Sequence, residues 1–91
     1  MTNSVRDNIA RQRFELDVEG HVAFSEYKRN GNVFIITHTE VPRVLNGKGI
    51  GSALVRGLLA LVRVEGAKIR PLCPFVRTYV EKHPEYADLL A

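Results

Sequence analysis

The chain has 91 residues, a formal net charge of +3, 45% hydrophobic residues and one cysteine. A chain of this length builds one small core, and one cysteine excludes an internal disulfide framework, so we expect a single domain over residues 1–91 that works as a monomer in the reducing cytoplasm. The cationic residues are scattered and no stretch approaches the roughly 18 apolar residues of a membrane span, so we expect neither nucleic-acid nor membrane binding.

The N-terminal residues 1–8 are polar, lack an apolar signal region and are expected to be flexible. From Phe14 to Val18, apolar and charged residues alternate, which is the pattern of a strand with one buried face. Glu19 and Gly20 then offer a tight turn. We therefore expect the folded part of the chain to begin with a half-buried strand.

Two further strands are predicted to follow. Residues 22–27 form the second, and Asn30-Gly31 indicates a hairpin, because a type I′ turn needs positive φ at both central positions. Residues 32–39 are rich in β-branched residues and contain a continuous apolar run from Val33 to Ile36, as in a central strand. The three strands together predict an antiparallel meander.

The hydrophobic period then changes from two to that of a helix. Residues 49–65 predict an amphipathic helix, and Gly66 supplies its stop. The apolar stripe of this helix consists of Ile50, Ala53, Leu54, Leu58, Leu61 and Val62. Residues 67–72 predict a fourth strand that pairs in parallel with the third through a right-handed crossover. Because Pro71 has no N–H to donate, we expect the two strands to part near their C-terminal ends.

The C-terminal region is predicted to be helical. Pro74 suits the first position of a helix, where a missing N–H costs nothing. His83-Pro84 ends or restarts the helix, and residues 85–90 predict a further helical turn or two. The predicted apolar face is Phe75, Val76, Tyr79 and Val80. The fold class is therefore α/β in the broad sense, α+β in detail, with the fourth strand splaying from the third.

A glycine-rich loop connects the third strand to the first helix. Gly47, Gly49 and Gly51 alternate just before the helix, so successive N–H groups can point at one spot where the helix dipole is positive. Such a spot suits a phosphate or pyrophosphate, and the alternative is a flexible loop before an ordinary helix. A P-loop does not fit, because Gly49 rather than Ser or Thr follows Lys48.

Three motifs together resemble the GNAT acetyltransferase superfamily, and more specifically its small single-domain GNAT-like N-acetyltransferases. They are His38-Thr39-Glu40-Val41-Pro42, the loop Asn46-Gly47-Lys48-Gly49-Ile50-Gly51-Ser52, and Leu72-Cys73-Pro74-Phe75-Val76 with Tyr79 and His83-Pro84-Glu85-Tyr86. The resemblance runs from about Phe14 to Leu90. Asn46 departs from it, since the signature has Arg or Gln there.

The resemblance implies acetyl-CoA as the acyl donor and an amine as the acceptor. It implies that the end of the third strand, from Thr39 to Val41, hydrogen-bonds the pantetheine arm. Lys48 or Arg43 could meet phosphate charge, or either could be a solvated surface cation. The implied pyrophosphate-binding loop consists of Asn46, Gly47, Lys48, Gly49, Ile50, Gly51 and Ser52.

Cys73 lies where the fourth strand passes into the second helix. A thiol at a helix N-terminus is stabilised as a thiolate, so Cys73 is a candidate nucleophile that would carry the acetyl group as a thioester. The alternative is a buried structural cysteine. In a direct transfer without a thioester, Glu40 or His38 would act as the base and Tyr79, as the resemblance implies, as the acid.

The sequence thus predicts a minimal GNAT-like acetyltransferase with Cys73, Tyr79 and Glu40 as catalytic residues. Two other classes stay open, namely an acyl-CoA-binding module without catalysis and a small domain with neither property. The three histidines are too widely spaced to suggest a metal cluster, so no metal is expected.

Overall fold

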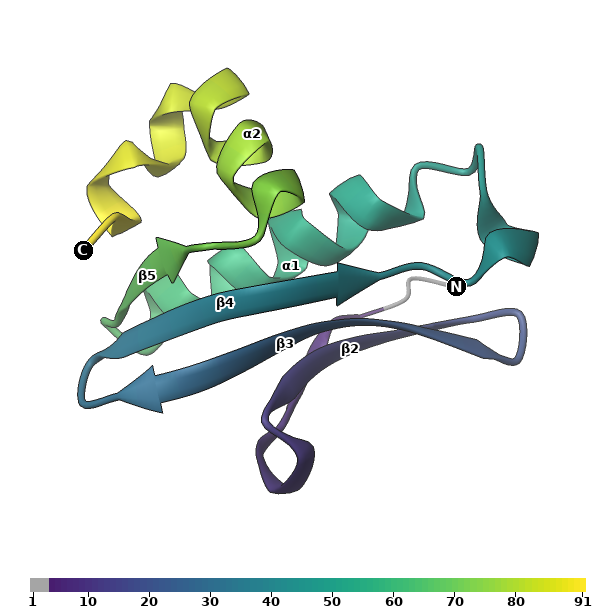
Figure 1. The fold of residues 1–91 in the computed structure, drawn as a ribbon, viewed down its shortest axis with the longest axis horizontal. Coiled ribbons are helices and arrows are strands. Elements are labelled where there is room, and N and C mark those ends of the chain that lie inside the picture. The colour runs from purple at the N-terminus through teal and green to yellow at the C-terminus, as the bar shows by residue number, and fades with distance from the viewer. Residues whose placement is uncertain (1–3) are drawn as a thin grey trace.

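The computed structural model describes residues 4–91, which form one five-stranded sheet, two α-helices and short 3₁₀ helices (Figure 1). In chain order the elements are β1 (Arg6–Asn8), η1 (Ile9–Arg11), β2 (Arg13–Val18), β3 (His21–Asn30), β4 (Val33–Glu40), η2 (Arg43–Leu45), α1 (Ile50–Val64), β5 (Lys68–Pro71), α2 (Pro74–Lys82) and η3 (Pro84–Leu89). Neighbouring strands are antiparallel except for β4 and β5, which pair in parallel. The predicted meander, crossover helix and parallel strand are therefore confirmed.

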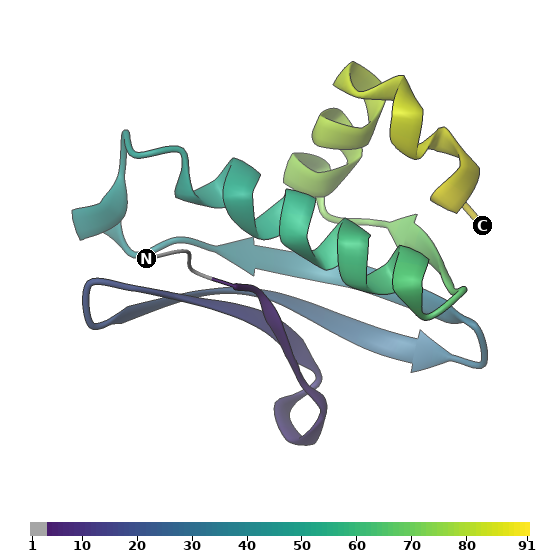
Figure 2. The same ribbon diagram turned by 180° about the vertical axis from the view of Figure 1, so that it is seen from behind.

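The helix α1 covers one face of the sheet. It passes behind β4 in Figure 1 and crosses in front of the sheet when the molecule is turned round in Figure 2. The helix α2 packs against α1 and against β4 and β5. Within residues 4–91, no helix is long and apolar enough to cross a membrane.

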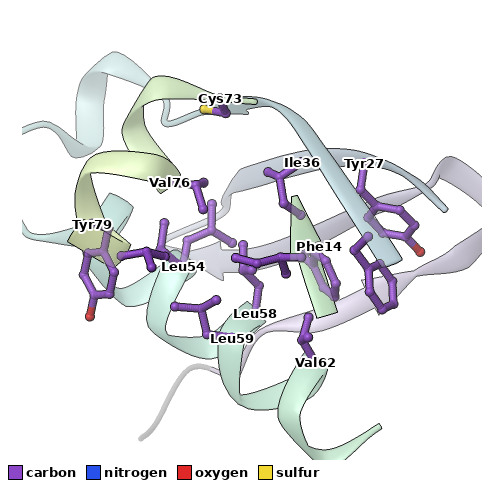
Figure 3. Close-up of a cluster of buried hydrophobic side chains, with 14 of the residues drawn as sticks. Phe14, Tyr27, Ile36, Leu54, Leu58, Leu59, Val62, Cys73, Val76 and Tyr79 are labelled. Carbon is purple, nitrogen blue, oxygen red and sulfur yellow. The ribbon is translucent and has the colours of Figure 1, made fainter. Parts of the chain in front are cut away.

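The core fills the space between the sheet and the helices (Figure 3). Alternation along the strands places Phe14, Tyr27 and Phe34 on the covered face, with ring centroids 4.9 to 5.4 Å apart. The arc of α1 that is fully buried is Leu54, Val55, Leu58, Leu59 and Val62. It differs from the predicted stripe because both the sheet and α2 contact α1, which leaves Ile50, Ala53 and Leu61 only partly buried.

The N-terminal strand β1 was not predicted, because a flexible segment was expected over residues 1–8. Residues 1–3 lie outside the described part, but β1 pairs antiparallel with β2. The pairing is supported by side chains far away in sequence. Arg6 forms ion pairs with Glu15 and Asp17, and the Tyr27 hydroxyl donates to Asp7 at 2.5 Å.

The two hairpin turns differ from the predicted pattern. Glu19 and Gly20 have φ of 52° and 79°, so the turn with positive φ at both central positions lies between β2 and β3. The pairing of Asn30 with Val33 moves the next turn one residue along the chain, and its first central residue, Gly31, has φ of 60°. The second hairpin therefore follows the type II′ pattern, in which only that position needs positive φ.

Candidate functional site

The strands β4 and β5 part at their C-terminal ends, as predicted. Their parallel pairing ends with Ile36 opposite Pro71. The Ile36 carbonyl then accepts from the N–H groups of both Leu72 and Cys73, each at 3.0 Å. Beyond this point β4 continues through a bulge at Thr37 toward Glu40 without β5 beside it. The result is an opening between the strand ends, where an open α/β sheet commonly binds its ligand.

Cys73 lies at this opening and directly precedes α2. It adopts an extended conformation as the N-cap, and Pro74 takes the first helical position. The Cys73 side chain is 6% exposed, and its Sγ lies 3.4 Å from Oγ1 of Thr39. The two prolines thus have separate roles, because Pro71 ends the strand pairing and Pro74 begins the helix.

Burial raises the pKa of the Cys73 thiol, but hydrogen bonds outweigh it. In the protonated state the thiol donates to Oγ1 of Thr39, and once the sulfur is ionised the Thr39 hydroxyl can donate to it, which lowers this pKa. The main-chain N–H groups of Val76, Phe75 and Thr39 act in the same direction. Together these donors hold the pKa of Cys73 below its usual value, which favours the nucleophilic thiolate.

The glycine loop builds a second feature at the start of α1. Gly47 and Gly49 have φ of 82° and 70°, and Gly49 is the N-cap without any side-chain cap. The first N–H groups of α1 therefore have neither an intrahelical partner nor a capping side chain. An open cavity of about 330 Å³ lies here, lined by Val41, Leu45, Asn46, Gly47, Gly49, Ile50, Gly51, Ser52 and Phe75. The arrangement suits an anionic group such as a phosphate.

Phe75 joins this cavity to a larger one on α2. Its ring is half exposed rather than part of the buried face of α2, which consists of Val76, Tyr79 and Val80. Phe75 and Ser52 also line a cavity of about 480 Å³, whose other walls are Pro74, Thr78, Tyr79, Lys82 and His83. The sequence analysis placed Phe75 on the apolar face of this helix, whereas in the structure its ring lies over Gly51 of α1 and lines both cavities.

Tyr79 is not brought to the sulfur. Its ring stacks on His83 with centroids 4.0 Å apart, and Nδ1 of His83 lies 2.8 Å from the Tyr79 carbonyl oxygen. Figure 3 shows the Tyr79 hydroxyl directed away from Cys73. Its predicted role as an acid stays a prediction.

The other predicted polar residues also lie apart from Cys73. Thr39 pairs with Ser25 on the covered face of the sheet, so its neighbours His38 and Glu40 project from the opposite face. There, Nε2 of His38 lies 3.8 Å from Oε1 of Glu40. Lys48 forms an exposed ion pair with Glu19 at 3.1 Å, on the turn between β2 and β3. The structure thus gathers Thr39 and Cys73, but neither of the predicted bases.

Ser25 was missed by the sequence analysis. It is a fully buried polar residue, and its Oγ lies 2.8 Å from Oγ1 of Thr39. The available signal was a small polar residue at an inward position between Ala23 and Tyr27. Within residues 4–91, no three His, Cys, Asp or Glu side chains are grouped closely enough to hold a metal ion.

Comparison with known proteins relates the chain to one group. The family model described as GCN5-related N-acetyl-transferase matches residues 13–89. An NMR solution structure of a GCN5-like protein from Staphylococcus aureus, taken to be an N-acetyltransferase, matches with a TM-score of 0.73 at 27% identity. This match covers 100% of the present chain and 91% of the other. A search of curated proteins finds no match.

Proposed function

Because the chain belongs to the GCN5-related N-acetyltransferase family, we propose that it binds acetyl-CoA and transfers the acetyl group to an amine through Cys73. The observation that carries the proposal is the position of the Cys73 sulfur at the opening between β4 and β5, beside main-chain N–H groups and the Thr39 hydroxyl. A sulfur held in this way is the kind of nucleophile that forms a thioester.

The cofactor is proposed to lie along the two cavities and the opening. Unpaired N–H groups at the start of α1 suit the pyrophosphate. Main-chain groups from Thr39 to Val41, at and just beyond the end of β4 where β5 no longer pairs with it, are proposed to bind the pantetheine arm. Lys48 is proposed to act on phosphate only at long range, since its ammonium group contacts Glu19.

The first step forms the thioester. The Cys73 thiolate attacks the acetyl carbonyl carbon, a new carbon–sulfur bond forms, and the bond to the CoA sulfur breaks. The electron pair of that bond leaves with CoA as a thiolate, which takes up a proton on release. The N–H groups around the sulfur hold the attacking atom in place, so positioning of the nucleophile contributes to the rate enhancement.

The second step consumes the thioester. A neutral amine attacks the same carbonyl carbon, the bond to Cys73 breaks, and the nitrogen loses one proton to solvent. The Cys73 thiolate returns to its starting state and the amide leaves. The donors that stabilise the thiolate as a nucleophile also stabilise it as a leaving group.

The experiment measures two quantities on the intact chain. Incubation with acetyl-CoA is expected to add one acetyl group to the protein by mass spectrometry and to release CoA when an amine is supplied. Cys73→Ala removes the adduct and serves as the control. Release of CoA without any adduct indicates direct transfer, and the absence of both contradicts the proposed activity.

Binding is tested separately from chemistry. Titration of CoA into labelled protein should move the NMR signals of residues 46–52. A ligand at 100 times its dissociation constant stabilises a fold by about 2.7 kcal/mol, which a thermal unfolding experiment detects. Binding without acetylation or CoA release would indicate an acyl-CoA-binding module instead.

A further inference from the structure

Two hydroxyl groups on the covered face of the sheet lead from β3 to the sulfur of Cys73. Ser25 on β3 and Thr39 on β4 are direct partners across the antiparallel pair, and both face the helices. Oγ of Ser25 lies 2.8 Å from Oγ1 of Thr39, which lies 3.4 Å from Sγ of Cys73. Ser25 and Cys73 are 0% and 6% exposed. The three side chains therefore form a row of hydrogen bonds, which we call the hydroxyl row, with buried ends at Ser25 and Cys73 and a partly buried Thr39 between them.

The row has a direction that depends on the charge of the sulfur. A thiolate only accepts, so the Thr39 proton points to Cys73 when the sulfur is ionised. The Thr39 oxygen is then free to accept, and Ser25 is placed to donate to it. When the sulfur is protonated or acetylated, the Thr39 proton can turn to Ser25. Both arrangements keep the two hydroxyls hydrogen-bonded to each other, so neither state of the sulfur leaves the buried Ser25 hydroxyl unsatisfied.

We propose that Ser25 is a positioning residue for the acetyl transfer, which orients the Thr39 hydroxyl so that it donates to the Cys73 thiolate. The inference rests on the proposed function of Cys73 as the nucleophile. Ser25 does not touch the reacting atoms and acts through Thr39. The same donation stabilises the sulfur as it attacks and again as it leaves.

Charged side chains near this row are directed elsewhere. On α2, Arg77 donates to the carbonyl groups of Pro71 and Leu72. On β4, His38 and Glu40 project from the opposite face of the sheet, as does Arg70 on β5, which is the partner of Ile35. The hydroxyl groups of Thr39 and Ser25 are therefore the side-chain groups whose substitution tests how the thiolate is stabilised.

The test titrates the thiol of the intact protein without any cofactor. Thiolate absorbance near 240 nm is followed against pH, with Cys73→Ala as the reference that subtracts the tyrosines. Thr39→Val is expected to move the Cys73 titration toward alkaline pH, and Ser25→Ala to move it in the same direction by less. The double variant should match Thr39→Val, because Ser25 acts only through Thr39.

Conservative and matched variants complete the design. Ser25→Thr and Thr39→Ser keep a hydroxyl and should titrate close to the original protein. Tyr27→Phe removes a different buried hydroxyl two residues along the same strand and should leave the thiol unchanged. If Ser25→Ala fails to fold, the comparison of Thr39→Val with Thr39→Ser still decides whether the hydroxyl row acts on the sulfur.

Transfer kinetics give the second readout. Near neutral pH, Thr39→Val should lower the acetylation rate of Cys73 about tenfold, as expected for the loss of a hydrogen bond to a charged group. Ser25→Ala should leave the CoA dissociation constant unchanged. An unshifted titration in Ser25→Ala, or shifts that add in the double variant, overturns the inference. Because the titration needs no cofactor, a failure of acetyl-CoA binding would leave that result standing.

Discussion

The ring of Phe75 lies directly over Gly51, so that a Cβ at position 51 would sit 2.7 Å from its Cζ. This contact brings the first turn of α2 against the first turn of α1. It also forms the wall between the two proposed cofactor cavities. The absence of a side chain at position 51 therefore leaves room for the ring that separates the two cavities.

Gly51→Ala tests this wall. The added methyl group should displace the half-exposed ring, so we expect severalfold weaker CoA binding by calorimetry. The free energy of unfolding should change by less than about 1 kcal/mol, because alanine also favours the helix. Phe75→Leu in the same background should restore part of the affinity. Unchanged affinity in the single variant would show that the ring is not part of the binding surface.

Gly57→Ala is expected to behave differently, although it lies on the same helix. A Cβ at position 57 would overlap the Val5 side chain just before β1. We expect a loss of about 1–3 kcal/mol in the free energy of unfolding, as overpacking costs, instead of the usual gain from replacing a helical glycine. Urea unfolding measures it. Recovery in Gly57→Ala/Val5→Ala would assign the loss to this contact, and a stabilised single variant would contradict it.

The buried carboxylate of Glu15 predicts a dependence of stability on pH. Burial raises the pKa of Glu15, but hydrogen bonds from Arg13, Asn8 and Arg6 outweigh it and hold this pKa below its usual value of 4.5. The unfolded chain therefore binds the proton more readily, so this stabilisation is complete above about pH 4.5 and is lost as the pH falls through the folded value.

Glu15→Gln should remove that dependence. The Glu15 side chain is only 3% exposed. We therefore expect the variant to lose about 3 kcal/mol in the free energy of unfolding near neutral pH, since Arg6 and Arg13 lose their charged partner. Urea unfolding at several pH values should show a flatter acid limb than in the original protein. Asp17→Asn, an exposed partner of Arg6, is the control and should cost less than about 1 kcal/mol. Equal losses in both variants would contradict the importance of burial.

Tyr79→Phe separates the proposed thioester route from the predicted acid. The Tyr79 hydroxyl points away from Cys73, so its removal should leave the acetylation rate of Cys73 within about threefold. Single-turnover kinetics followed by mass spectrometry measures this step. A loss of a hundredfold would show that the hydroxyl turns toward the opening during the reaction. His83→Ala, which removes the stacking partner, is the matched control for a change in ring packing.

Local patterns were sufficient for most of the fold. The alternation from Phe14 to Val18 and the helical period after Gly49 each depend on neighbours within a few residues, and both predictions are confirmed. The strand β1 was missed because three polar residues carry no alternation. Its support comes from Glu15 and Tyr27, which only the folded sheet brings near.

In the candidate site, too, the features set by adjacent residues could be predicted and those set by distant residues could not. The glycine loop and the position of Cys73 at the start of a helix could be predicted, since each depends on adjacent residues. The face of the sheet that Glu40 occupies could not be predicted, because a bulge at Thr37 decides it. The burial of Tyr79 on the apolar face of α2 was predicted, but the direction of its hydroxyl depends on the packing of α2. Ser25 was hidden for a similar reason, since a serine in a strand gives no indication of which hydroxyl it meets.

The two hydrogen bonds that the Ile36 carbonyl accepts from Leu72 and Cys73 hold Cys73 to the central strand β4 rather than to a surface segment. On warming, we therefore expect the glycine-rich loop, residues 46–52, to become disordered before Cys73 is displaced. If the proposed function holds, the affinity for CoA would then fall at a lower temperature than the reactivity of the Cys73 thiol.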